Sequence, residues 1–212
     1  MQTRWGRLSR IIASCVALAL FAAEACSTTI NVSVSSPGFA AASATLAFDF
    51  IDGGPPDNTV TLSALTSNGT QGSTSTSGSV SGTGPWVFSD ATPFNELLVS
   101  FNPLGTTLTF SFTTSDNPPA ANPPSFPDSF SFFLLDAAGV SPLITTDAPG
   151  GSNALFQFDI TGFGAEGLTV YTPVESGFSI LADTGTTVPE PGSLALLVAA
   201  LGAFNLRRRP RP

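Results

Sequence analysis

Alternation of apolar and small polar side chains is the feature that most limits what this sequence can fold into. In residues 107–112, Leu108, Phe110 and Phe112 alternate with threonine and serine. Side chains with a period of two point to opposite faces of a β-strand, and Phe, Val, Ile and Thr favour its half-buried surface. Each such segment is therefore predicted to be a strand with one apolar face. The same pattern recurs in residues 45–50, 129–134 and 154–160.

Further short apolar segments are separated by clusters of Gly, Pro, Asn and Asp, which turn the chain. These candidate strands are residues 30–34, 59–64, 86–89, 97–101, 168–172 and 178–181. No segment between the two ends has a helical period with caps. About eight to ten strands predict an all-β fold, a two-sheet antiparallel sandwich with jelly-roll or Greek-key topology. Most of the 18 phenylalanines of the chain are at inward positions of these strands and are expected to form the core.

Two segments interrupt the succession of strands. Residues 66–84 are almost entirely Ser, Thr and Gly, a composition that buries little surface, so a mobile loop is predicted there. Residues 116–127 contain five prolines in twelve positions. Because proline cannot donate to a strand ladder, this segment is predicted to be an extended surface loop.

Charge is distributed very unevenly. The chain has no histidine, and its seven Lys and Arg residues all lie in residues 4–10 and 207–211. Of its 15 acidic residues only Glu24 precedes Cys26, so residues 26–190 carry 14 acids and no base. Binding to a phosphate backbone requires clustered Lys and Arg, so nucleic acid is excluded as a partner. Cations or an uncharged, hydroxyl-rich matrix remain as partners.

Residues 1–25 have the three parts of a secretory signal peptide. Basic residues occur in residues 1–10, residues 11–21 are apolar, and Ala23-Glu24-Ala25 forms an A-x-A cleavage site. Signal peptidase is expected to recognise Ala23 and Ala25 and to cut after Ala25, which leaves Cys26 as the only cysteine. The alternative is a retained anchor, but 11 apolar residues fall short of the ~20 that span a bilayer as a helix.

Residues 188–212 contain Pro189-Glu190-Pro191, then small residues, the apolar run 194–206, and Arg207-Arg208-Arg209. This order resembles the PEP-CTERM sorting domain. The run should form a short hydrophobic helix, and the positive-inside bias would hold the cluster Arg207, Arg208 and Arg209 on the cytoplasmic side. A helix of 13 residues reaches only ~20 Å against a ~30 Å hydrocarbon core, which favours a temporary inner-membrane anchor. The alternative is an ordinary tail anchor.

The resemblance implies processing near Pro189-Glu190-Pro191 by an exosortase-type membrane enzyme. It also implies a bacterium with an outer membrane and an exopolysaccharide matrix. The expected organisation is a signal peptide in residues 1–25, a β-sandwich in 26–183, a linker in 184–187 and a sorting tail in 188–212.

Catalysis is restricted because residues 26–190 contain no His, Lys or Arg. Ser-His-Asp and Cys-His sites, Schiff-base lysines and His-ligated zinc are excluded. A carboxylate-based hydrolase would need two acids in one cleft, and no spacing proposes such a pair. The run Asp183-Thr184-Gly185 resembles the aspartic protease loop, but the sorting tail follows directly, so it is interpreted as the approach to that tail.

Two binding alternatives remain. Asp49, Asp52 and Asp57 flank a Gly-Gly-Pro-Pro turn and could supply oxygen ligands to calcium, although aspartates in turns usually cap the backbone. Trp86 and Tyr171 could stack on sugar rings, although such residues are more often part of a core. No other cofactor is predicted.

The leading prediction is an exported, non-enzymatic protein of the cell surface or extracellular matrix, with a role in a biofilm or in exopolysaccharide. The first alternative is a calcium- or carbohydrate-binding β-sandwich, and the second is a carboxylate-based hydrolase.

Overall fold

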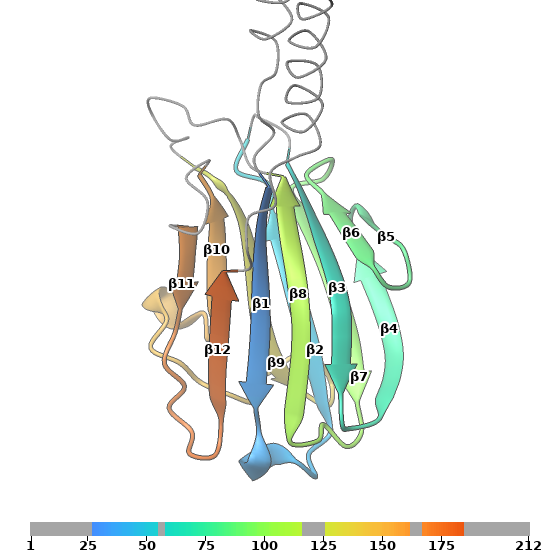
Figure 1. The fold of residues 1–212 in the computed structure, drawn as a ribbon, viewed down its shortest axis with the longest axis vertical. Coiled ribbons are helices and arrows are strands. Elements are labelled where there is room, and N and C mark those ends of the chain that lie inside the picture. The colour runs from blue at the N-terminus through green and yellow to red at the C-terminus, as the bar shows by residue number, and fades with distance from the viewer. Residues whose placement is uncertain (1–26, 55–57, 116–125, 162–166, 185–212) are drawn as a thin grey trace, which may run out of the picture. The chain divides into compact units, whose positions relative to one another are not determined.

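Strands make up nearly all of the regular structure in a computed structural model that describes residues 27–54, 58–115, 126–161 and 167–184 (Figure 1). Two three-residue 3-10 helices, η1 (Pro37–Phe39) and η2 (Pro149–Gly151), interrupt them. The strands are β1 (Ser27–Ser35), β2 (Ala44–Ile51), β3 (Thr59–Ser67), β4 (Gln71–Ser77), β5 (Val80–Ser81), β6 (Trp86–Ser89), β7 (Phe94–Phe101), β8 (Thr107–Ser115), β9 (Asp128–Asp136), β10 (Phe156–Ile160), β11 (Leu168–Val170) and β12 (Ser179–Thr184).

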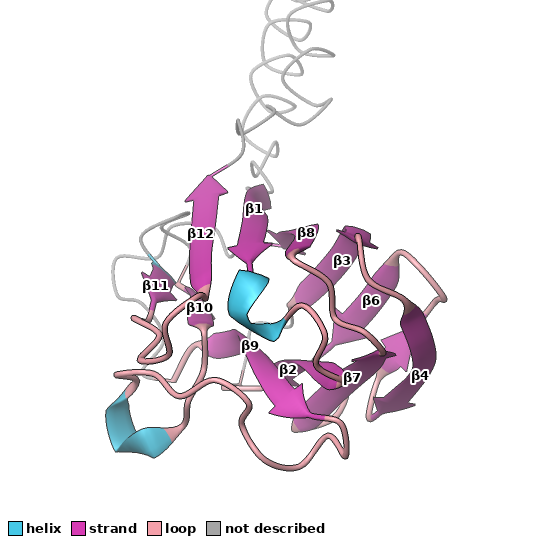
Figure 2. Ribbon diagram, turned by 90° about the horizontal axis from the view of Figure 1, so that it is seen from below, coloured by secondary structure: helices cyan, strands magenta, loops and turns pink. Residues whose placement is uncertain are grey.

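The strands form two antiparallel sheets that pack face to face, seen as two layers in Figure 2. The first sheet has the order β12-β1-β8-β3-β6-β5, and the second has the order β11-β10-β9-β2-β7-β4. Strands β1 to β4 alternate between the two sheets. The later strands then pair with them in reverse order: β6 with β3, β7 with β2, and β8 with β1. This nested pairing is a jelly roll, extended by β9, β10 and β11 on one sheet and by β12 on the other. The predicted sandwich is confirmed.

Phenylalanine rings from both sheets interlock to form the core. Phe110 and Phe112 project from β8, and each contacts rings of the opposite sheet. The Phe110 ring meets Phe48 edge-on at a centroid distance of 5.1 Å, and Phe112 stacks on Phe156 at 5.3 Å. Such pairs contribute roughly 0.5–1.5 kcal/mol beyond the burial of their area. The predicted inward positions are confirmed, because Phe48, Phe50, Phe112, Phe130, Phe132, Phe156 and Phe158 are all fully buried.

The prediction of a mobile loop in residues 66–84 is wrong. β3 continues to Ser67, β4 occupies Gln71–Ser77, and β5 follows at Val80–Ser81. Every residue of β4 is exposed, so backbone pairing with β7, and not burial, holds this strand. Composition indicates how much surface a segment can bury, and it therefore missed a strand that buries almost none.

The turn between β3 and β4 depends on side chains that composition does not reveal. The Asn68 carboxamide oxygen accepts hydrogen bonds from the backbone N–H groups of Thr106 and Thr107. A Cβ atom at Gly69 would lie only 2.2 Å from the Leu104 carbonyl oxygen, so only glycine fits there. These contacts join the turn to the β7–β8 connection and bring the chain from one sheet to the other.

Most of the proline-rich segment, residues 116–125, lies outside the described residues, as do the predicted signal helix and the C-terminal hydrophobic helix. Within the described ranges, no helix has the length and apolar character needed to cross a membrane.

Replacing Phe112 with alanine is expected to lower the free energy of unfolding by about 3–5 kcal/mol, because it removes a ring that contacts three others across the core. The matched control is Phe94→Ala, whose side chain is 46% exposed and should cost about 1 kcal/mol or less. Urea unfolding followed by fluorescence measures both changes, and equal losses would contradict this account of the core.

Candidate functional site

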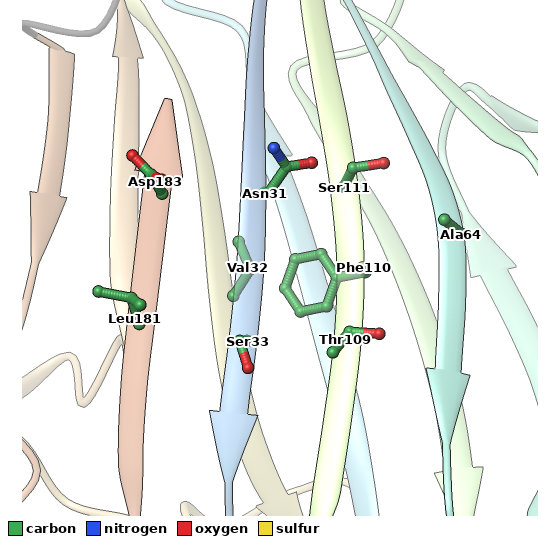
Figure 3. A pocket seen from close by; sticks show the side chains of 9 residues that line it. All are labelled: Asn31, Val32, Ser33, Ala64, Thr109, Phe110, Ser111, Leu181 and Asp183. Atoms are coloured by element: carbon green, nitrogen blue, oxygen red, sulfur yellow. The ribbon is translucent and has the colours of Figure 1, made fainter. Parts of the chain in front are cut away.

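A shallow groove of about 340 Å³ crosses the outer face of the first sheet (Figure 3). Four adjacent strands line it, β12, β1, β8 and β3. Its outward side chains come from alternate positions of each strand, because the positions between them fill the core. The lining residues are Asn31, Val32, Ser33, Ala64, Thr109, Phe110, Ser111, Leu181 and Asp183.

Strand pairing brings together groove residues that are far apart in the sequence. Asn31 on β1 lies opposite Asp183 on β12, and Ser33 lies opposite Leu181. On its other side, Asn31 is paired with Ser111 of β8. The side chains of Asn31, Ser33 and Asp183 make no hydrogen bond to any described residue. The groove therefore presents an amide, a hydroxyl and a carboxylate that are free to bind a ligand.

A β-bulge forms the β3 side of the groove. Ser63 pairs with Ser111 and Thr66 with Thr109, so Ala64 and Leu65 together oppose the single residue Phe110. Ala64 has a φ of 53°, a left-handed conformation that is unfavourable for alanine. Strained residues of this kind cost of order 1–3 kcal/mol and cluster at binding sites, and bulges redirect strands beside such sites.

A second bulge accompanies a second hollow, of about 260 Å³, on the other sheet. Here Gln71 pairs with Phe101 and Thr74 with Val99, so Gly72 and Ser73 oppose Ser100. Residues Thr70, Gln71, Gly72, Ser100 and Asn102 are among its lining residues. The Ser73 and Ser100 hydroxyls are 3.1 Å apart and hydrogen-bond to each other. Unlike the first groove, this hollow has no charged side chain in its lining.

Two carboxylates lie side by side on the outer face of the second sheet. Asp49 on β2 is directly opposite Glu96 on β7. The Oδ1 atom of Asp49 is buried and has no hydrogen-bond partner among the described residues. Burial, and secondarily the Glu96 charge, raise the pKa of Asp49 to about 7. Asp49 can therefore hold a proton near neutral pH.

The residues predicted to bind calcium have different surroundings. The Asp52 carboxylate accepts a hydrogen bond of 2.6 Å from the Gly54 N–H, as an aspartate in a turn commonly does. Asp49 is beside Glu96, and Asp57 lies outside the described residues. Among the residues with described positions, no group of three acidic, His or Cys side chains could hold a metal ion. Calcium binding stays a prediction.

Asp128 holds the β2–β3 connection against β9. Its buried carboxylate accepts hydrogen bonds from the Gly53 N–H and the Asn58 side-chain amide. A Cβ atom at Gly53 would lie 2.2 Å from the Phe126 carbonyl oxygen, so the backbones meet closely there. Burial raises the pKa of Asp128, and the Asn58 and Gly53 hydrogen bonds partly oppose that rise. This network positions the loop through structural hydrogen bonds.

The two aromatic residues considered for sugar stacking do not form an exposed platform. Trp86 is 6% exposed and belongs to the core cluster, so the core interpretation is confirmed for it. Tyr171 is half-buried, and burial raises the pKa of its hydroxyl.

Sequence reasoning missed Asn31 and Glu96 as parts of candidate sites, and it interpreted Asp183 only as part of the approach to the sorting tail. Alternation alone places Asn31 and Ser33 on the polar face of β1, but only the pairing of β1 with β12 brings Asp183 beside them. Asp183 lies within β12, which extends to Thr184. The other predicted site residues lie outside the described part of the chain: Ala23, Ala25, Pro189, Glu190, Pro191, Arg207, Arg208 and Arg209.

The raised pKa of Asp49 predicts a stability that falls as pH rises. The unfolded carboxyl titrates near 3.8 and the folded one near 7, so the folded state binds more protons between these values. The stabilisation from the Asp49 carboxyl is fully present below its unfolded pKa and is lost as the pH rises through its folded pKa. The change is about 4 kcal/mol at most. Asp49→Asn should flatten the pH dependence of the free energy of unfolding, measured with urea from pH 4 to pH 8, a range that extends from near the unfolded pKa to above the folded pKa.

Glu96→Gln serves as the control for that experiment. It removes the neighbouring charge but leaves Asp49 buried, so it should shift the transition to lower pH without abolishing it. An unchanged pH profile in Asp49→Asn would contradict the assignment.

Comparison with known families identifies one segment of the chain. Residues 187–209 match the PEP-CTERM protein-sorting motif, in agreement with the resemblance drawn from Pro189-Glu190-Pro191. No curated protein and no solved structure is similar enough to this chain to count as a match. The chain therefore carries a PEP-CTERM sorting motif, which supports export and sorting to the cell surface by an exosortase-type enzyme.

Proposed function

We propose that this protein is a non-enzymatic component of the bacterial cell surface or extracellular matrix, associated with the exopolysaccharide of a biofilm. The observation that carries the proposal is the sorting motif at residues 187–209, joined to a β-sandwich without a basic side chain. A signal peptide delivers the chain to the exported side, and the tail then holds it at the inner membrane until it is processed.

The composition of the sandwich supports a binding or structural role. With no His, Lys or Arg between residues 11 and 206, the domain lacks the usual partners that activate a Ser, Cys or Thr nucleophile. Its acids repel anionic polymers. A neutral, hydroxyl-rich matrix is the environment that suits such a surface.

The alternative of a carboxylate-based hydrolase would depend on Asp49 and Glu96, the cross-strand pair of acids. Such an enzyme places its acids in a cleft where both reach the scissile bond. Asp49 and Glu96 instead lie on the outer face of a sheet, and neither lines the two hollows described above. This position favours a role for the pair in stability.

Replacing Pro189, Glu190 and Pro191 with alanine should leave the sandwich folded but prevent correct sorting, because the core residues all precede the motif in the sequence. Intact mass and fractionation in the native host measure the outcome. The wild-type product should begin at Cys26, end near Pro189-Glu190-Pro191 and lie outside the inner membrane. The variant should retain residues 207–212 and stay in the inner membrane.

A matched control replaces Pro123, Pro124 and Ser125 with alanine, which changes three residues of similar kind in the proline-rich segment. It should be processed as the wild type is. Normal distribution of the Pro189-Glu190-Pro191 variant, or retention of the tail by the wild-type protein, would overturn the sorting proposal.

A further inference from the structure

We infer that the groove on the outer face of the first sheet binds a neutral polysaccharide chain, which lies across β12, β1, β8 and β3. The inference rests on the proposed function, because a matrix protein needs a face that holds matrix polymer. It assigns that face to Asn31, Ser33, Leu181 and Asp183.

The dimensions of the groove suit a short stretch of polymer. Its volume of about 340 Å³ falls within the range of roughly 300–1,000 Å³ typical of ligand sites. Four adjacent strands spaced by ~4.8 Å extend about 14 Å from the first to the last. Figure 3 shows the lining side chains on these neighbouring strands.

The free polar groups match the chemistry of sugar hydroxyls. The Asp183 carboxylate can accept two O–H donors, and the Asn31 amide both donates and accepts. These two side chains are directly opposite each other on neighbouring strands. Hydroxyls of adjacent sugar carbons would meet an acceptor on β12 and a donor on β1. Backbone pairing holds both positions before binding, which lowers the entropy lost on association.

Further contacts come from the rest of the lining. The Ser111 hydroxyl is 3.0 Å from that of Ser63, and the Thr109 hydroxyl is 2.7 Å from that of Thr66. A hydroxyl has two lone pairs and one proton, so each pair keeps capacity for a ligand. Leu181 is 67% exposed and offers an apolar surface to the C–H face of a sugar ring.

Charge selects a neutral polymer over an acidic one. Asp183 is the charged side chain of the groove, and the described residues include no base that could pair with a uronate or a sulfate. An anionic chain would therefore meet repulsion without compensation. A neutral chain meets none, and its hydroxyls supply the donors that Asp183 lacks in the free protein.

Affinity electrophoresis of the full-length protein tests the inference. Native gels would contain dextran, galactomannan, laminarin or the neutral fraction of the host's own extracellular polysaccharide, with alginate as the acidic polymer and chitosan as the cationic one. At least one neutral polymer should retard the protein, and alginate should not. Asn31→Ala/Asp183→Ala should weaken binding at least tenfold.

The matched control is Gln157→Ala/Asp159→Ala, which also removes one amide and one carboxylate, but from the outer face of the opposite sheet. It should change binding less than twofold. Thermal unfolding verifies that both variants fold. If the groove variant does not fold, Leu181→Asn replaces it, because the Leu181 side chain is already 67% exposed.

Several results would overturn the inference: no retardation by any neutral polymer, equal losses in the groove and control variants, or retardation by chitosan or alginate alone. Concentration-dependent self-association that the groove variant abolishes would also overturn it, because the groove would then join two copies of the chain. The assay uses purified protein, so it is independent of sorting. Correctly sorted protein that fails to bind would disprove the groove assignment and leave the proposed surface location intact.

Discussion

Packing of phenylalanine rings between the two sheets is the interaction on which the rest of this structure depends. Residues 26–190 contain one cysteine and no basic side chain, so disulfides and ion pairs cannot stabilise the domain. Hydrophobic burial must do so, at roughly 25 cal/mol per Å² of apolar surface. The rings of Phe110 and Phe112 on β8 contact β2, β9 and β10 of the other sheet. Both outer faces are held in place by this contact.

A well-filled core leaves the outer faces free to carry polar groups. On the first sheet those groups are mostly neutral and lie in a groove beside a strained bulge at Ala64. On the second sheet Asp49 and Glu96 are adjacent, and the raised pKa of Asp49 reflects its half-buried position. The groove on the first face is the proposed site of contact with a hydroxyl-rich polymer. The other face links stability to pH.

The sorting motif and the sandwich divide the work of the protein between separate parts of the chain. Residues 187–209 contain the sorting signal, a short linear motif that is recognised by the order of its residues. The sandwich carries whatever contacts the surface protein makes after sorting. The cellular location of the protein can therefore be predicted from residues 187–209 alone. A ligand of the sandwich cannot be predicted in this way, because its binding residues would come from strands that are adjacent only in the folded domain.

The sequence by itself determined the strands with a buried face and the sorting motif, because each depends on local order: a period of two for a strand such as β8, and contiguous residues for Pro189-Glu190-Pro191. It could not predict β4, which is exposed throughout and held by pairing with β7. Nor could it place Asn31 opposite Asp183, since 152 positions (183 less 31) separate them. Strand order and register bring such residues together. Both depend on how the whole chain packs, and a local sequence pattern does not contain that information.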